Sequence, residues 1–216
     1  MHKTVSAYLA RQTLSPLSPS PERKYRAVVV IPCHAEAEAL PALLESLARM
    51  DMKHGAETAC IFVLNNSISA GDDVRKSNAD SYQLISASAQ LLSPLSVFVI
   101  DAYTPGHELP EKEAGVGLAR KIGMDAALQL FHDDQGLLVC LDADCTVSPD
   151  YLTVLFEDGI ASNVQAGCFP FFHPIAQGTP NREAIIVYEI YLRYYLAGLR
   201  YAGSPHAFHT IGSTMI

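Results

Sequence analysis

The chain has 216 residues, enough for one domain with a sizeable core, and 49% of them are hydrophobic, which excludes a disordered or fibrous protein. Its formal net charge of −8 argues against a sequence-independent nucleic-acid binder, whose affinity comes from neutralising phosphates. The 5 cysteines are scattered and form no C-x-x-C pair, so we expect reduced thiols rather than a zinc site or a disulfide framework.

Residues 1–24 are predicted to form an exposed lead-in, because residues 12–22 are rich in Ser and Pro. No apolar stretch resembling a signal peptide follows the basic residues near the start, and no run of about 18 apolar residues is present. We therefore expect no transmembrane segment in this chain, and a protein that is cytoplasmic or peripheral at the inner face of the membrane. Residues 25–216 are expected to form a single domain.

Four continuously apolar segments predict strands that are buried on both faces of a parallel sheet. They are residues 27–32, 58–64, 96–101 and 137–141. Helical patterns lie between and after them, at residues 40–50, 74–92 and 115–131, and from Ser148, which is expected to cap a helix with Pro149 in its first turn. Alternating strands and helices predict an α/β domain with a mostly parallel, Rossmann-like sheet and helices on both faces.

The last third of the chain has a different pattern. Residues 165–172 are aromatic and predict a strand, residues 183–201 predict a Tyr-rich helix, and residues 207–216 predict a further strand. The tyrosines of the helix lie on more than one of its faces, which favours core packing or a partner interface over sugar stacking. They are Tyr188, Tyr191, Tyr194, Tyr195 and Tyr201.

The strongest chemical signal is the pair Asp142 and Asp144, directly after the fourth predicted strand. Residues two apart on an extended segment point to the same side, so their carboxylates repel each other unless a cation lies between them. Hard cations such as Mg²⁺ and Mn²⁺ take oxygen ligands, and Mg²⁺ commonly combines one or two carboxylates with substrate phosphates. The pair predicts a divalent metal site; the alternative is two solvated aspartates in a turn.

Three further stretches accompany this pair in the order of a known family. Residues 28–36 read VVVIPCHAE, in which Pro32 and Glu36 match the opening of family 2 glycosyltransferases and Ala35 stands where Asn is usual. Residues 117–123 resemble the family's G-x-A-R-N-x-G stretch, with Lys121 at the Asn position, and residues 141–144 and 147–152 resemble its metal motif and the following helix. The sequence therefore resembles family 2 glycosyltransferases over about residues 26–152.

This resemblance implies a GT-A-like nucleotide-diphospho-sugar transferase fold. It also implies metal-dependent, inverting transfer of a sugar from a nucleoside-diphosphate sugar to an acceptor hydroxyl, in glycan or cell-surface polysaccharide synthesis. The expected partners are the nucleotide sugar and a glycan or lipid-linked acceptor, with no nucleic acid.

Carried over by position, the resemblance also assigns residues to the donor site. Those implied to bind the donor nucleotide are Pro32, His34, Glu36, Asn65, Asn66, Arg120 and Asp142. Those implied to hold Mg²⁺ or Mn²⁺ are Asp142 and Asp144. His34 stands where the family often has an aromatic residue against the base, and Asn65 or Asn66 stands where an acidic residue often reads the base or ribose. Arg120 is either a donor contact or a helix-packing residue.

The family usually places its general base in an acidic stretch beyond the last strand predicted here. The chain ends at Met215-Ile216, in the middle of an apolar run. We therefore expect a domain truncated before the catalytic base, with the base beyond Ile216. Such a piece is expected to bind the donor nucleotide and to transfer sugar poorly.

Two other functions compete with this interpretation. Residues 142–146 also fit the D-x-D-x-T signature of haloacid dehalogenase-like phosphatases, in which Asp142 would be the nucleophile and Asp144 the general acid. That motif ordinarily heads its domain, which argues against it here. A non-catalytic domain of the same fold is the other alternative, because Ala35, Asn65 and Lys121 depart from the family pattern.

Overall fold

The computed structural model describes residues 3–132, 136–162, 165–175, 178 and 181–208. The chain divides into two units, Met1–Gln165 and Ala166–Ile216. The strand predicted over residues 207–216 lies outside the described residues from position 209 onward.

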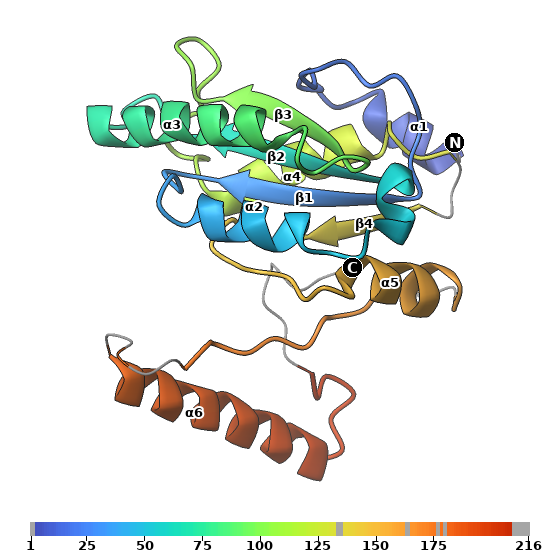
Figure 1. Cartoon of the computed structure of the whole chain (residues 1–216), viewed down its shortest axis with the longest axis vertical. Coiled ribbons are helices and arrows are strands. Elements are labelled where there is room, and N and C mark those ends of the chain that lie inside the picture. The colour runs from blue at the N-terminus through green and yellow to red at the C-terminus, as the bar shows by residue number, and fades with distance from the viewer. Residues whose placement is uncertain (1–2, 133–135, 163–164, 176–177, 179–180, 209–216) are drawn as a thin grey trace. The chain divides into compact units, whose positions relative to one another are not determined.

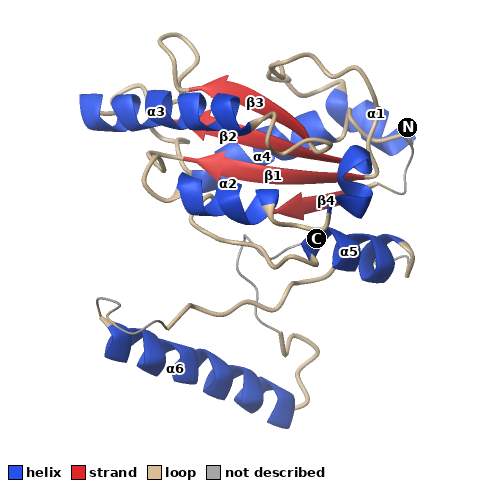
Figure 2. Ribbon diagram, viewed as in Figure 1, coloured by secondary structure: helices blue, strands red, loops and turns tan. Residues whose placement is uncertain are grey.

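The first unit is built on a four-stranded parallel sheet in the order β3-β2-β1-β4 (Figures 1 and 2). Its strands are β1 (Ala27–Cys33), β2 (Thr58–Asn65), β3 (Ser96–Ala102) and β4 (Leu137–Cys140). Every residue of β1 and β2 is buried, as expected for central strands covered on both faces. The predicted α/β class with a parallel sheet is confirmed.

The strand order places a switch point between β1 and β4. From β1 the chain moves to β2 and then β3 on one side, and it returns to pair β4 with the opposite edge of β1. Val30 is in register with both Ile61 of β2 and Cys140 of β4. In open α/β sheets, ligands bind outside the carboxyl ends of the strands at such a point.

Helices cover both faces of this sheet, as predicted. Helices α2 (Leu40–Ala48) and α3 (Asp72–Ser88) lie on one face, and α4 (Val116–Ala127) lies on the other (Figure 1). The α4 face buries one apolar cluster, whose main members are Val28, Val30, Ala59, Ile61, Val63, Ile100, Ala119, Ala126 and Ala127. Small residues of α4 therefore meet β-branched residues of the strands, which allows a close approach of helix and sheet.

Most residues of the N-terminal lead-in that the structure describes are exposed or half-buried, and several of them contact the sheet and α4. The lead-in begins with α1 (Lys3–Leu9), whose Tyr8 hydroxyl donates a hydrogen bond to Asp125 Oδ1 of α4 at 2.8 Å. Further on, Ser18 and Val99 exchange two backbone hydrogen bonds, of 2.9 and 2.8 Å, along the outer edge of β3. The Ser- and Pro-rich segment thus pairs with an edge strand whose backbone groups would otherwise be open to other chains.

The predicted cap of the helix after β4 is wrong. Ser148 Oγ donates to Asp150 Oδ1 at 2.5 Å, and the N-cap is Asp150. Pro149 precedes the helix and is not in its first turn, and its carbonyl accepts a hydrogen bond from the Asp51 amide at 2.7 Å. The helix α5 (Tyr151–Val154) therefore begins later, and it continues as a π-helical segment η2 (Leu155–Ile160) beside the 3-10 helix η1 (Met52–Glu57).

The second unit contains the predicted Tyr-rich helix, α6 (Arg182–Tyr201). The strand predicted over residues 165–172 is wrong, because residues 165–175 form no β-strand and only Cys168 among them makes an isolated β-bridge. Two prolines, Pro170 and Pro174, remove donors that a ladder would need. The adjoining His173 instead donates from its backbone N and from Nδ1 to Glu189 Oε1 of α6, at 2.9 and 2.6 Å.

Candidate functional site

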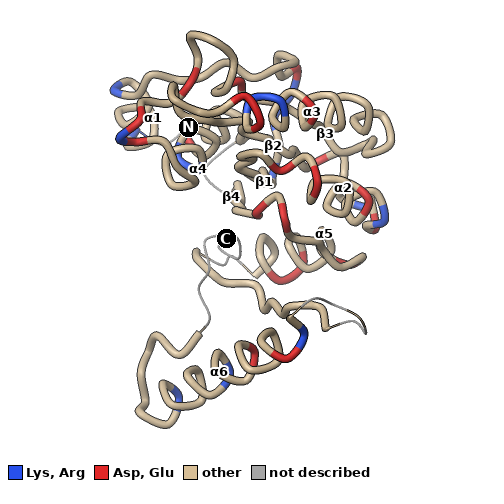
Figure 3. The backbone as a smooth tube through the Cα atoms, turned by 90° about the vertical axis from the view of Figure 1, so that its left-hand side faces the viewer, with Lys and Arg blue, Asp and Glu red and all other residues tan. Residues whose placement is uncertain are grey.

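The site lies where β1 and β4 end side by side. Leu141, directly after β4, continues the register by donating from its backbone N to the Val30 carbonyl at 3.0 Å. Asp142 and Asp144 follow, separated by the buried Ala143. Asp142 is half-buried and Asp144 is exposed. The segment is a turn closed by a hydrogen bond from the Cys145 amide to the Asp142 carbonyl at 3.2 Å rather than an extended strand, so the common side of the two carboxylates stays a prediction. Figure 3 shows acidic positions, in red, on the segments that follow β1 and β4.

Glu36, in the turn after β1, belongs to the same acidic group. Its pKa is raised first by partial burial and then by the negative charges of Asp144 and Asp142, while nearby His34 acts in the opposite direction. The two turns are therefore close enough for their carboxyl groups to repel one another. An added cation would relieve that repulsion, so the site favours a positively charged or metal-bound ligand.

Arg120 of α4 supplies a positive charge to this group. Its Nη2 donates to Asp142 Oδ1 at 2.7 Å, and the two side chains are 15% and 30% exposed. The Nε of Arg120 is buried and has no hydrogen-bond partner among the described residues. A buried donor without a partner is unusual in a folded protein, and a ligand oxygen could satisfy it.

His34 is exposed at the start of the β1 turn, where Pro32 is buried in the strand. The Nδ1 of His34 donates to the Asn65 carbonyl at 2.9 Å. In the neutral ring this bond leaves Nε2 as a hydrogen-bond acceptor. The next residue, Ala35, has a φ of 58°, a left-handed conformation that non-glycine residues rarely adopt.

Asn65 and Asn66, at the end of β2, are buried, with 2% and 0% of their surface exposed. The amide nitrogen of Asn65 donates to the Cys33 and Val63 carbonyls at 3.0 and 3.2 Å, and that of Asn66 donates to the Ser67 carbonyl at 3.0 Å. These amides hold the strand ends together. Their contact with the base or ribose stays a prediction.

Sequence reasoning missed Asn78, which α3 brings to the same place. Asn78 is fully buried, and its side chain bonds to the turns after β1 and β2. The buried stripe of α3 consists of Asn78, Ser81 and Ile85, at helical spacings of three and four. A helical face with two polar residues pointing at a hydrophobic sheet was the available signal.

Lys121, which departs from the family pattern, takes no part in the acidic group. Its Nζ donates to Gln12 Oε1 at 2.8 Å and to Asp125 Oδ2 at 2.6 Å, and it lies 5.7 Å from the centre of the Tyr8 ring. Neighbouring residues of α4 therefore make different contacts. Arg120 bonds to Asp142 after β4, and Lys121 bonds to Gln12 of the N-terminal segment.

Asp142 and Asp144 offer the oxygen donors that a hard cation requires. Within the described residues, no group of three or more His, Cys, Asp or Glu side chains is arranged to hold a metal ion. The described residues therefore provide a partial coordination shell at this position. Such a shell fits an ion that takes its other ligands from phosphate oxygens and water, as Mg²⁺ often does.

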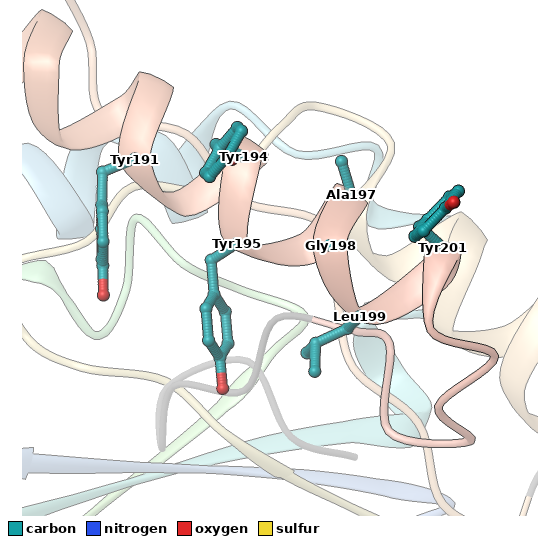
Figure 4. Close-up of a pocket in the computed structure, with 7 residues that line it drawn as sticks. All are labelled: Tyr191, Tyr194, Tyr195, Ala197, Gly198, Leu199 and Tyr201. Carbon is teal, nitrogen blue, oxygen red and sulfur yellow. The ribbon is translucent and has the colours of Figure 1, made fainter.

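The tyrosines of α6 line a separate surface in the second unit (Figure 4). Tyr191, Tyr195 and Leu199 extend to one side of the helix, and Tyr194 and Tyr201 extend to another (Figure 4). The Tyr191 and Tyr195 rings stack with centroids 6.4 Å apart. As the sequence predicted, the tyrosines occupy more than one helical face.

None of the helices in the described ranges combines the length and apolarity needed to cross a bilayer.

The fold and this site define an open α/β protein with an acidic, partly arginine-neutralised site at its switch point. The sequence matches no protein-family model and no curated protein. The structure is similar to S. aureus TarS 1–349, with a TM-score of 0.48 and 15% identity, over 72% of this chain and 38% of that chain.

Two further TarS structures show the same degree of similarity. TarS 1–349 in complex with UDP-GlcNAc gives a TM-score of 0.48 and 16% identity over 72% of this chain. TarS 1–349 in complex with UDP gives 0.46 and 15% over the same share. This chain covers 37% to 38% of the length of the TarS chains.

Proposed function

We propose that this chain is the donor-binding part of a metal-dependent, inverting glycosyltransferase. It would move a sugar from a nucleoside-diphosphate sugar to the hydroxyl of a glycan or lipid-linked acceptor, in glycan or cell-surface polysaccharide synthesis. We place this reaction in the cytoplasm or at the inner face of the membrane. The observation that carries the proposal is the group of charged side chains at the switch point of the sheet, where Glu36 follows β1, Asp142 and Asp144 follow β4, and Arg120 Nη2 lies 2.7 Å from Asp142 Oδ1.

The turn after β1 binds the nucleoside in this proposal. Glu36 and the exposed His34 would face the nucleoside, with His34 against the base, and the buried Pro32 would support them from the end of the strand. The His34 ring is exposed while its Nδ1 is fixed on the Asn65 carbonyl, which suits a side chain that must meet a ligand in one orientation. Asn65 and Asn66, buried at the end of β2, hold the turn that carries His34, and their contact with the base or ribose would require that turn to open.

The diphosphate lies between the two carboxylates and α4. Asp142 and Asp144 would hold Mg²⁺ or Mn²⁺, which when bound supplies positive charge to stabilise the departing diphosphate. Arg120 would contribute a second, permanent positive charge from α4, where Asp142 holds its guanidinium in place. The partnerless Nε of Arg120 is available to a phosphate oxygen after a small movement of the side chain.

The reaction exchanges one bond at the anomeric carbon. The bond from that carbon to the phosphate oxygen breaks, and its electron pair stays on the nucleoside diphosphate. The acceptor oxygen forms the new bond from the opposite face, which inverts the configuration. Its proton passes to a general base, normally a carboxylate. None of the described residues is assigned as that base.

A titration with Mn²⁺ and a panel of UDP, GDP, ADP and CDP tests the proposal. Isothermal titration calorimetry should detect one nucleoside diphosphate that binds in the presence of Mn²⁺ and far more weakly in EDTA. Absence of binding by every member of the panel would overturn the donor site and favour a non-catalytic domain. Metal-dependent phosphatase activity that Asp142→Asn abolishes, without nucleotide binding, would favour the phosphatase interpretation instead.

A further inference from the structure

Asn78 lies in the second turn of α3, and its side chain is completely enclosed. Its Oδ1 accepts from the Ala35 amide at 2.9 Å. Its Nδ2 donates to the Asn65 carbonyl at 3.0 Å and to Asn66 Oδ1 at 2.9 Å. Both donor hydrogens and the acceptor oxygen of this one side chain are therefore used between the turns that follow β1 and β2.

Core packing does not explain an amide at this position. Burying an amide costs free energy, which its hydrogen bonds offset only when the geometry is complete. Seven residues further along the same helix face, the buried residue is the apolar Ile85. This face of α3 can therefore bury apolar residues, and we attribute the amide at position 78 to its hydrogen bonds with the two turns.

The contacts of Asn78 determine the conformation of the β1 turn. Ala35 holds a left-handed backbone, with φ at 58°, which is costly for an alanine. The bond from the Ala35 amide to Asn78 stabilises that conformation, and a second bond of 3.3 Å joins the Ala37 amide to Ser77 Oγ. The first half of α3 therefore holds the turn at two successive points.

Asn78 also acts on His34 through a shared acceptor. The Asn65 carbonyl accepts both from His34 Nδ1, at 2.9 Å, and from Asn78 Nδ2, at 3.0 Å. The carbonyl that orients the exposed imidazole is thus itself held by the buried amide. Loss of Asn78 would free the carbonyl and the Ala35 amide together, and both flank His34 in the structure.

We propose that Asn78 is a positioning residue of the donor site, which fixes residues 34–36 in the conformation that receives the nucleoside. This inference rests on the proposed function. A turn held before binding loses less conformational freedom when the ligand arrives, so the affinity is higher than with a mobile turn. Asn78 touches no substrate in this role and acts only through the backbone of the two turns.

The test compares Asn78→Ala with Ile85→Val, a destabilising change seven residues further along the same buried helix face. The probe is the nucleoside diphosphate that binds best with Mn²⁺ in the panel above, at a temperature where circular dichroism shows both variants folded. We expect the Kd to rise about tenfold or more in Asn78→Ala and less than about twofold in Ile85→Val. Equal changes in both variants, or none in either, would overturn the inference.

Amide hydrogen exchange provides a readout that does not depend on nucleotide. Exchange at Ala35 should accelerate in Asn78→Ala while the amides of β1 keep their protection; unchanged exchange at Ala35 would overturn the inference. If the wild-type protein binds no nucleotide, the proposed donor site is refuted. The exchange rate of the Ala35 amide then still shows whether Asn78 fixes the turn. If Asn78→Ala does not fold, Asn78→Ser, which keeps a hydroxyl but is too short to reach all three partners, takes its place in both measurements.

Discussion

Arg120 and Asp142 form an ion pair, with Nη2 of the arginine 2.7 Å from Oδ1 of the aspartate, and this pair connects α4 to the end of β4. Asp144, two residues further, is exposed and takes part in no ion pair among the described residues. The two aspartates of the motif therefore differ in their surroundings. Asp142 has a structural partner, and Asp144 is available to a ligand.

Asp144→Ala should abolish metal-dependent binding and leave the fold intact. The exposed carboxylate makes few contacts, so we expect a change in unfolding free energy within about 0.5 kcal/mol. Calorimetry with Mn²⁺ and the best-binding nucleoside diphosphate should show the Kd raised about tenfold or more, because one of two predicted metal ligands is lost.

Asp158→Ala is the matched control for that variant. Asp158 is also exposed, and its removal changes the net charge by the same amount. Nucleotide binding in this control should equal that of the wild type. A similar loss of affinity in both variants would indicate a general effect of charge and would contradict the assignment of Asp144.

Asp142→Ala should lower stability, unlike Asp144→Ala. It leaves the largely buried guanidinium of Arg120 without its carboxylate, and Nε of that side chain already has no partner. We expect a loss of about 1–3 kcal/mol in urea denaturation. In a double-mutant cycle with Arg120→Ala, the coupling energy should be about 1–2 kcal/mol. Additive effects of the two single changes would show that the ion pair does not stabilise the fold.

The fold could be predicted from the sequence because the strands are buried on both faces. All four begin at the first residue of the apolar runs predicted for them, at Ala27, Thr58, Ser96 and Leu137. Prediction failed where local signals competed with distant contacts. Ser148 has the residue type of a cap, but its hydroxyl bonds to Asp150. The aromatic residues before His173 predicted a strand, but His173 is hydrogen-bonded to Glu189 of α6.

The candidate site was only partly predictable. The spacing of Asp142 and Asp144 predicts that they share a side, and the strand order, which sequence spacing does not reveal, brings Glu36 near them. The burial of Asn65 and the role of Asn78 depend on how α3 packs over two strand ends. Such contacts join residues distant in sequence, so the polar face of α3 could mark Asn78 as unusual but could not identify its partners.

Ala35→Asn and Ala35→Gly should both stabilise the protein. Ala35 holds a φ of 58°, which asparagine and glycine adopt more readily than alanine does. We expect a gain of about 0.5–1 kcal/mol in denaturant unfolding, smaller for glycine because its unfolded state is more flexible. Ala37→Gly, at a neighbouring turn position without positive φ, should instead lower stability. A loss of stability in Ala35→Asn would show that the turn is not strained.

Gly123→Ala should weaken the packing of α4 on the sheet and with it the donor site. A Cβ at position 123 would lie 2.3 Å from Cγ1 of Val30 and 2.9 Å from Cγ2 of Val63, so the helix must move away from β1 and β2. We expect a loss of about 1–3 kcal/mol in stability, together with weaker nucleotide binding, because Arg120 is carried by the same helix. Gly117→Ala is the control, since a Cβ there meets nothing within 4 Å and alanine favours the helix by up to about 1 kcal/mol. If both variants are equally stable, α4 does not approach the sheet closely at Gly123, and the placement of Arg120 beside Asp142 loses its structural basis.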